Sequence, residues 1–223
     1  MKESRAKNDY NLLAPFYDWL GKAMFFGAIA KSQRRFLHDI PINARILFIG
    51  GGTGFLLNDL LESARPECIY YVEKSSEMIR KSEEACTHQD NQKVHFIHGT
   101  QDDLPDEFSC NVVLSFFFFD QFEAKELMEI FHLLDKKTSA EAWWLWSDFI
   151  PPETWWQRIL MNTMLRFFQF TTELSTRRVF HVPEMFVQSG YLIEKEDFFY
   201  KGFIRSVVMK KAGGLSPVGL PGK

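Results

Sequence analysis

The chain has 223 residues, of which 46% are hydrophobic and 25% charged, so it can bury the core of one α/β domain with an elaboration. Its formal net charge of −3 gives no basic footprint for nucleic acid. The three cysteines, Cys68, Cys86 and Cys110, are widely spaced and form no CxxC motif, which indicates neither a disulfide framework nor a metal site. We expect a cytoplasmic protein, because the first residues lack the apolar run of a signal peptide and no stretch reaches the length of a membrane span.

Hydrophobic periodicity predicts alternating helices and strands in the first two thirds of the chain. Residues 8–38 have helix-like apolar spacing, and we expect an N-terminal helical cap over residues 1–40, which Pro41 ends. After this cap, strands are expected at residues 45–49, 69–72, 94–97, 112–117 and 142–146, and helices at residues 54–63, 76–86 and 121–134. Such an alternation predicts a mostly parallel sheet with helices on both faces.

The pattern changes after the two prolines at 151–152, where we expect a helical insertion over residues 151–190. Two helices and then two strands are expected here, at residues 153–170, 183–189, 192–200 and 204–210. The Lys201-Gly202 pair between the two strands is typical of a hairpin, so the closing strands should be antiparallel. Gly and Pro are frequent in residues 212–223, which should form a flexible tail after a single domain over residues 1–211.

The most informative stretch is residues 46–54, in which four apolar residues run into a cluster of glycines. This pattern predicts a buried strand, a tight turn and a helix whose free N–H groups point at a ligand. Glu73 follows 19 residues after Gly54, at the end of the second expected strand. A nucleoside-binding α/β unit places a carboxylate about there to accept hydrogen bonds from ribose hydroxyls. The alternative interpretation is a purely structural glycine turn.

These motifs resemble the class I S-adenosylmethionine (SAM)-dependent methyltransferases, on the side of the ubiquinone/menaquinone C-methyltransferases. The likeness covers roughly residues 8–210 and rests on residues 46–54, Glu73, the 99–105 loop and the closing hairpin. The segment from Tyr10 to Asp18 is also similar to the family's segment that folds over the methyl donor. The resemblance implies a doubly wound, mostly parallel seven-stranded sheet with an antiparallel last strand, and SAM as the cofactor.

The resemblance also implies which residues hold the donor. The glycines of the first motif would line its amino-acid moiety, Glu73 would accept from both ribose hydroxyls, and the 100–102 loop would meet the adenine edge. Lys74 and Met78 would flank the adenine, and Ser115 with Phe116 would lie beside the reactive methionine portion. The full set expected to bind the cofactor is Gly50, Gly51, Gly52, Thr53, Gly54, Glu73, Lys74, Met78, Thr100, Gln101, Asp102, Ser115, Phe116, Tyr10 and Tyr17.

Methyl transfer from a sulfonium is an in-line displacement, so the protein mainly aligns the reactants and excludes water. A neutral oxygen or nitrogen that accepts the methyl group would still benefit from a general base. Candidate bases are His98, Asp120, Asp148 and His181, of which we select Asp148 and His181 as the catalytic residues. Asp148 has the best position, because it follows the fifth expected strand at the carboxyl edge of the sheet, although it could instead cap a turn.

Aromatic residues make up 16% of the chain, which favours a small apolar or aromatic methyl acceptor. The segment 155–170 has three interpretations. We favour a buried helix. It could also form a wall of an acceptor pocket, or, least favoured, a helix that lies on a membrane surface. Two other functions stay open. An NAD(P)-dependent oxidoreductase is one alternative, but the dinucleotide-binding fingerprint has a glycine or alanine at about the position of Phe55. A non-catalytic nucleoside-binding module would fit Phe48 and Thr100, because the family usually has acids at these two positions.

Overall fold

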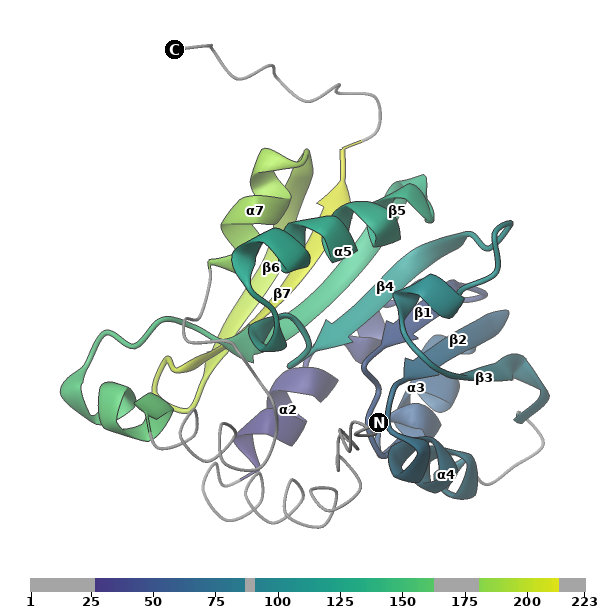
Figure 1. Ribbon diagram of the computed structural model, residues 1–223, viewed down its shortest axis with the longest axis horizontal. Coiled ribbons are helices and arrows are strands. Elements are labelled where there is room, and N and C mark those ends of the chain that lie inside the picture. Colours follow the sequence, from purple (N-terminus) through teal and green to yellow (C-terminus); the bar gives the residue numbers. More distant parts are fainter. Residues whose placement is uncertain (1–26, 87–90, 163–180, 213–223) are drawn as a thin grey trace, which may run out of the picture.

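The structure is a computed structural model that describes residues 27–86, 91–162 and 181–212 (Figure 1). A seven-stranded sheet runs through it in the order β3-β2-β1-β4-β5-β7-β6. The strands are β1 (Arg45–Ile49), β2 (Cys68–Glu73), β3 (Val94–His98), β4 (Cys110–Phe116), β5 (Thr138–Phe149), β6 (Tyr191–Phe199) and β7 (Ile204–Lys211). All neighbouring strands pair in parallel except β7, which runs antiparallel to both β5 and β6. The predicted fold class is therefore confirmed.

Helices cover both faces of this sheet, with α5 and α7 on one face and α3 and α4 on the other (Figure 1). The described α-helices are α2 (Ala28–Arg34), α3 (Leu57–Ala64), α4 (Ser76–Ala85), α5 (Ala124–Lys136), α7 (Val182–Gln188) and a helical stretch over residues 155–162. Strand β1 lies between β2 and β4, so the chain winds away from it in both directions. The winding direction reverses between β1 and β4, which is the switch point of the sheet. Ligands of such sheets bind at the carboxyl ends of the strands beside the switch point.

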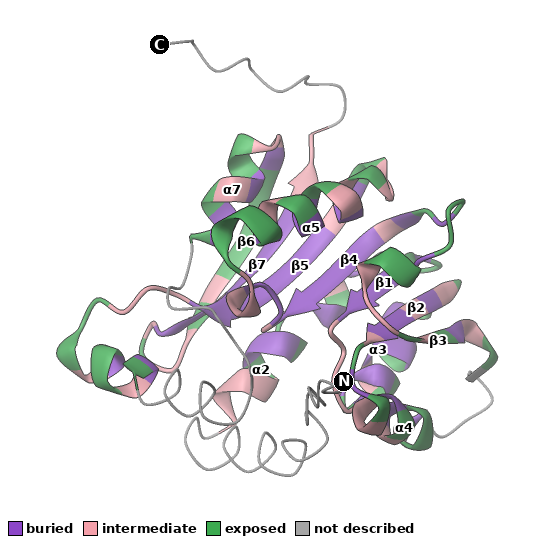
Figure 2. Cartoon of the chain, in the orientation of Figure 1, coloured by how far each residue is buried: buried purple, intermediate pink, exposed green. Residues whose placement is uncertain are grey.

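The core consists of two apolar layers, one on each face of the sheet (Figure 2). In β1 the alternation of side chains sends Ile46 and Phe48 into the layer under α3, and Leu47 and Ile49 into the layer under α5. Because both faces are covered, β1 reads as a continuous apolar run rather than an alternating one. This burial fixes the register of β1, and with it the position of the glycine turn that follows.

Several element boundaries differ from the sequence expectation. The helix expected from residue 54 begins at Leu57, because Gly54 still has a positive φ of 75°. Strand β4 ends at Phe116, one residue early, because Phe117 adopts a left-handed φ of 51°. Strand β5 runs from Thr138 to Phe149, well beyond the expected 142–146, because it pairs with β7 as far as Phe149.

The described part of the N-terminal cap is α2 with a short 3-10 turn over Leu37–Asp39. A chain of buried hydroxyl groups fixes α2 to the sheet: Ser147 Oγ bonds to Ser32 Oγ at 2.9 Å, and Ser206 Oγ bonds to Ser147 Oγ at 3.0 Å. The rest of the predicted cap, residues 1–26, lies outside the described residues. The division into cap, insertion and tail stays a prediction.

The described part of the aromatic segment, residues 155–162, is helical and only partly buried. Trp156 packs edge-on against Phe203, with ring centroids 5.9 Å apart. By contrast, the side chains of Trp155 and Ile159 are exposed. The favoured interpretation as a buried helix therefore holds for one side of this turn of helix only. No helix in the described part of the chain is long and apolar enough to cross a membrane.

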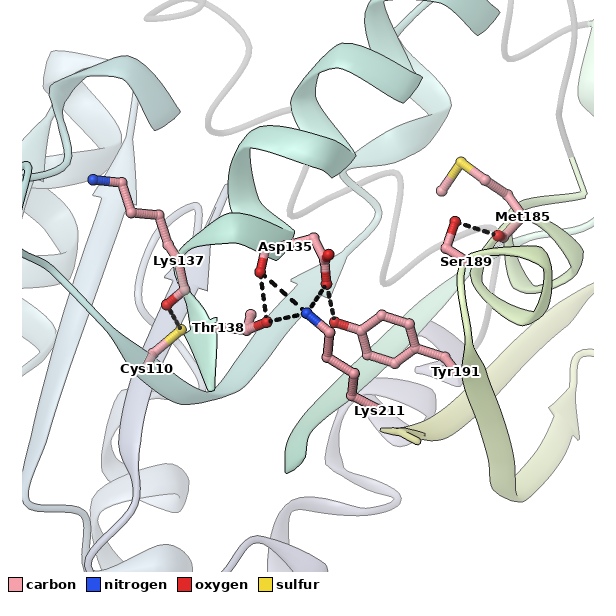
Figure 3. A network of polar contacts seen from close by, with 8 residues as sticks. All are labelled: Cys110, Asp135, Lys137, Thr138, Met185, Ser189, Tyr191 and Lys211. Atoms are coloured by element: carbon pink, nitrogen blue, oxygen red, sulfur yellow. Dashed lines mark hydrogen bonds and ion pairs between the residues drawn. The ribbon is translucent and has the colours of Figure 1, made fainter. Parts of the chain in front are cut away.

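A partly buried polar network ties the end of α5 to the last two strands of the sheet (Figure 3). One carboxylate oxygen of Asp135 accepts from the Tyr191 hydroxyl and from Lys211 Nζ, each at 2.7 Å. Lys211 Nζ also donates to Thr138 Oγ1 at 3.3 Å. Tyr191 is fully buried, so its hydroxyl depends on Asp135 for a partner. The network fixes β6 and β7 against the first residues of β5.

Asp135→Ala should lower the free energy of unfolding by about 2 kcal/mol, because the Tyr191 hydroxyl loses its hydrogen-bond acceptor and Lys211 loses its carboxylate partner. Tyr191→Phe should cost less, about 1 kcal/mol, because it removes only one neutral donor. Urea unfolding followed by circular dichroism measures both. Lys136→Ala, an exposed neighbour on α5, is the control and should change stability by less than about 0.5 kcal/mol. An Asp135→Ala effect no larger than that of the control would contradict the role of the network.

Candidate functional site

The turn between β1 and α3 is built from residues 50–56, directly after the central strand. The N–H of Gly50 donates to the carbonyl of Val72 at 2.9 Å, which extends the β1–β2 pairing by one residue. Gly50, Gly52 and Gly54 then have φ values of 65°, 67° and 75°. These left-handed conformations are costly for residues with a Cβ, so the sequence needs glycine at these positions to make the turn.

The turn is packed on one side and open on the other. A Cβ on Gly51 would overlap the ring of the fully buried Tyr71, and a Cβ on Gly54 would lie 2.7 Å from Ser82 Cα of α4. The Tyr71 hydroxyl supports the turn from below by donating to the carbonyl of Gly52 at 3.0 Å. A Cβ on Gly52, in contrast, would meet no atom of the described residues within 4 Å. The main chain is therefore accessible to a ligand at Gly52. Nothing in the order of the residues indicates this supporting role of Tyr71.

Glu73, the last residue of β2, lies directly against this turn. Its Oε2 accepts the Gly52 N–H at 3.0 Å, and its Oε1 accepts the Ser75 N–H at 2.8 Å. Burial raises the pKa of Glu73, and these main-chain N–H groups partly offset the rise. A carboxylate can accept about four hydrogen bonds, so further donors from a ligand can be accommodated. The structure brings together the two parts of the motif that sequence spacing had only related.

The expected adenine contacts lie at the carboxyl ends of β2 and β3. Lys74 is exposed directly after β2, and Met78 lies in the first turn of α4, where its N–H donates to Ser75 Oγ at 3.3 Å. Thr100 caps a 3-10 turn over Gln101–Asp103, and its Oγ1 accepts the Asp102 N–H at 3.3 Å. Asp102 itself is exposed. These residues follow the strand ends next to Glu73.

Other expected donor residues are placed differently. Ser115 is fully buried, and its hydroxyl accepts from Trp144 Nε1 at 2.7 Å. Phe116 packs edge-on against Phe48, with ring centroids 5.8 Å apart. Phe48, at the position where the resembled family has an acid, is a core residue that also contacts Tyr71. Thr53 is half-buried within the turn. Tyr10 and Tyr17 lie outside the described residues.

The run of four phenylalanines begins with Phe116, the last residue of β4, and continues into a sharp turn rather than prolonging the strand. The N–H of Phe117 still donates to the Ser147 carbonyl at 2.8 Å, but its left-handed φ redirects the chain. Phe118 then packs beneath the glycine turn, because a Cβ on Gly50 would lie 2.7 Å from its ring. Strained backbone of this kind is common at functional sites. The turn carries Asp120 toward the end of β5.

Two of the four candidate bases meet at this point. Asp148, the penultimate residue of β5, is 2% exposed, and its Oδ1 accepts the Phe149 N–H at 2.8 Å. Its Oδ2 and the Oδ1 of Asp120 are enclosed, and neither has a hydrogen-bond partner among the described residues. Burial raises the pKa of Asp120 to about 6. Burial and then the nearby charge of Asp120 raise the pKa of Asp148 well above its usual value.

The two candidate histidines lie in open surroundings. His98 is exposed at the end of β3, with its Nε2 3.1 Å from the Lys74 carbonyl oxygen. The side chain of His181 is 70% exposed before α7, and its Nδ1 lies 3.9 Å from Glu184 Oε2. The structure therefore encloses the two aspartates but neither histidine.

Comparison with known proteins agrees with this geometry. Residues 46–137 match the model of a family described as a methyltransferase domain, which spans β1 through α5. No curated protein matches the chain by sequence.

Solved structures share the fold over most of the chain. A SAM-dependent methyltransferase from Aquifex aeolicus superposes with a TM-score of 0.63 at 14% identity, covering 92% of this chain and 100% of the other. The plantazolicin methyltransferase BpumL, bound to S-adenosylhomocysteine (SAH), superposes with a TM-score of 0.63 at 11% identity, covering 92% of this chain and 91% of the other. A protein in complex with the Haloferax volcanii Trm112 methyltransferase activator superposes with a TM-score of 0.65 at 16% identity, covering 92% of this chain and 98% of the other.

At these identities the structural likeness establishes the fold. The matched residues, from β1 through α5, are similar to a methyltransferase domain. Neither the nicotinamide alternative nor the non-catalytic alternative is favoured by these comparisons.

The packing of the glycine turn predicts unequal effects of two neighbouring substitutions. Gly51→Ala should lower the free energy of unfolding by about 2 kcal/mol, because its methyl group overlaps the buried ring of Tyr71. Gly52→Ala should cost about 1 kcal/mol, from its left-handed backbone alone, because its methyl group meets open space. Urea unfolding of both variants compares them directly. Equal losses, or a larger loss for Gly52→Ala, would contradict the described packing.

Proposed function

We propose that the protein transfers the methyl group of SAM to a small apolar or aromatic acceptor, and that the donor lies across the carboxyl ends of β1, β2 and β3. One observation carries the donor part of this proposal. The Glu73 carboxylate bonds to the N–H of Gly52, at the one glycine of the turn whose Cβ position faces open space. A ribose placed there can reach a carboxylate and approach bare main chain at the same time.

The residues around Gly52 fit an adenosyl ligand in chemistry as well as in place. The glycine turn offers main-chain polar groups with no side chain in front of them, and Glu73 offers lone pairs for two hydroxyl groups. Lys74 and the first turn of α4 continue on one side, and the turn capped by Thr100 continues on the next strand end. We assign the predicted donor-binding residues of the glycine turn, of the end of β2, of α4 and of the 100–102 loop to this edge as part of the proposal. Ser115 and Phe116 stay predictions, and Tyr10 and Tyr17 lie outside the described residues.

The bound donor supplies a methyl group that is already activated by its sulfonium, so the work of the protein is alignment and proton handling. Aromatic side chains lie at the ends of β4 and β5. The ring centroids of Phe117 and Phe149 are 5.2 Å apart, and those of Phe118 and Phe122 are 5.1 Å apart. Rings of this kind suit an apolar or aromatic acceptor. The likeness to the ubiquinone/menaquinone C-methyltransferases makes hydroxylated aromatic rings the first class to test.

For the general base we favour Asp148, because it is enclosed at the carboxyl edge and one of its oxygens lacks a partner within the described residues. His181 stays a prediction, since its imidazole is exposed and lies beside Glu184. The cytoplasmic location also stays a prediction, as does the assignment of a small molecule, and not a nucleic acid, as the partner.

Calorimetric titration with SAH tests the donor site. The wild-type protein should bind SAH, and Glu73→Gln should weaken binding by about 5-fold to 150-fold, which corresponds to losing about 1–3 kcal/mol of charged hydrogen bonds. Glu62→Gln, an exposed glutamate on α3, is the matched control and should bind like the wild type.

Near-ultraviolet circular dichroism of the same samples checks that Glu73→Gln remains folded, because Glu73 also holds the N–H groups of Gly52 and Ser75. Absence of heat from the wild type at millimolar SAH would refute the proposed function. Heat with NADH and none with SAH would favour the nicotinamide alternative instead.

A further inference from the structure

Two carboxyl groups come together where the turn after β4 meets the end of β5. Asp148 belongs to β5, and Asp120 lies in the 3-10 turn over Phe119–Gln121. This 3-10 turn contacts β5, and the charge of Asp120 lies near enough to raise the pKa of the Asp148 carboxyl group. Each has one enclosed oxygen without a partner in the described part of the chain.

A third orphaned polar atom lies on the same face of the sheet. Trp146 is two residues before Asp148, so the alternation of side chains places both on the face covered by α5 and α7. Trp146 is 1% exposed, and its Nε1 also lacks a hydrogen-bond partner among the described residues. Buried polar atoms are almost always paired in folded proteins, so these atoms, which have no partner among the described residues, are candidate contacts for a ligand.

The cation nearest in the sheet register does not neutralise these acids. Arg205 of β7 lies directly opposite Asp148, but its guanidinium pairs with Glu196 of β6 at 2.8 Å and with Glu184 of α7 at 3.4 Å. Those glutamates are the charged groups that the neighbouring elements bring to this corner, together with the exposed His181. Neither aspartate thus has a salt bridge to a cation among the described residues.

A capping role explains only part of this arrangement. The bond from the Phe149 N–H occupies one oxygen of Asp148, and an asparagine could accept it equally well. The second oxygen is buried at a cost to stability, and so is that of Asp120. Enclosed acids whose pKa values are raised by burial, and in one case by a neighbouring acid as well, are typical of sites that bind or move a proton.

We propose that Asp120 and Asp148 form one proton-sharing carboxyl pair, which binds the methyl acceptor through an O–H or N–H group and takes the proton of that group during methyl transfer. This inference rests on the proposed function and specifies its acceptor. It adds Asp120 to Asp148 as a catalytic residue, and it requires an acceptor that carries a hydrogen-bond donor, such as a hydroxylated or amino-substituted ring.

The charge of the pair follows from its surroundings. Burial raises the pKa of both carboxyl groups, and the charge of Asp120 raises that of Asp148 further, so the pair keeps a proton, on Asp148, to higher pH than an ordinary aspartate does. It then presents one O–H donor and several acceptor lone pairs. A neutral O–H or N–H group can bind to such a pair, whereas a carboxylate or phosphate at the same point would be repelled.

The reaction balances with these groups alone. The acceptor forms a bond to the methyl carbon while the carbon–sulfur bond breaks, and the electron pair of that bond remains on sulfur. The O–H or N–H proton of the acceptor passes to the ionised carboxylate of the pair. The acceptor therefore loses a proton and gains a methyl group, and the positive charge of the sulfonium is replaced by the added proton. No further base is needed.

The dependence of thermal stability on pH tests the shared proton without any acceptor. An aspartate whose pKa is raised by folding binds its proton more tightly when folded, so the free energy of unfolding falls as pH rises from about 4 through its folded pKa, about 6 for Asp120. At pH 8, Asp120→Asn and Asp148→Asn should therefore raise Tm above the wild type by about 2–8 °C. Near pH 4 this gain should vanish.

The double variant distinguishes a pair from two independent acids. Removing either carboxyl relieves the repulsion on the other, so the double variant should gain less than the sum of the single gains. Asp106→Asn, an exposed aspartate in the loop after β3, is the control and should show no such pH-dependent gain. Variants that lower Tm equally at pH 4 and pH 8, or gains that simply add, would overturn the pair.

Phenol and toluene, added to SAH-saturated protein, test the acceptor class, because they differ mainly in the hydroxyl group. In protein labelled with ¹³C at the aspartate carboxyl carbons, phenol should shift the signals that disappear in Asp120→Asn and Asp148→Asn, and toluene should not. Phenol that leaves these signals unchanged would overturn the inference. The two failures are distinguishable: loss of SAH binding by the wild type refutes the proposed function, whereas intact SAH binding with an unresponsive carboxyl pair refutes only this inference.

Discussion

The hydrogen bond from the main-chain N–H of Gly52 to the carboxylate of Glu73 is the interaction on which the account of this site depends. It joins the turn after β1 to the end of β2, and β1 together with β4 flanks the point where the winding of the sheet reverses. The bond requires a left-handed main chain at Gly52 and a ring, that of Tyr71, filling the space under the turn. The geometry of the proposed donor site therefore depends on the packing of the core beneath the turn.

The second half of the proposed site is built on a different principle. The glycine turn exposes main chain, whereas the ends of β4 and β5 enclose acidic side chains among aromatic rings. Phe118 connects the two halves, because it packs under Gly50 and lies two residues before Asp120. The left-handed Phe117 makes this connection possible by turning the chain at the end of β4. A methyl donor on one side and a proton-sharing pair on the other would face the same edge of the sheet.

The sequence predicted the sheet, its antiparallel closing pair and the meeting of the glycine turn with Glu73, because these depend on local periodicity and on glycine's freedom at positive φ. It could not predict the turn at Phe117, since a run of four phenylalanines has the composition of a buried strand. Asp120 was recognised as a candidate base but not selected, because its proximity to Asp148 arises only when the turn after β4 meets the end of β5. The support from Tyr71 was missed for a similar reason: nothing in the residue order shows that its ring lies under Gly51.

A crystal structure of the protein with SAH tests the central claim most directly, because the claim concerns where one carboxylate lies relative to one ligand. The account predicts both ribose hydroxyls within hydrogen-bonding distance of the two oxygens of Glu73, with the ligand passing over the bare face of Gly52. Density for the nucleoside elsewhere on the sheet edge, or a Glu73 side chain that faces away from the ribose, would contradict it.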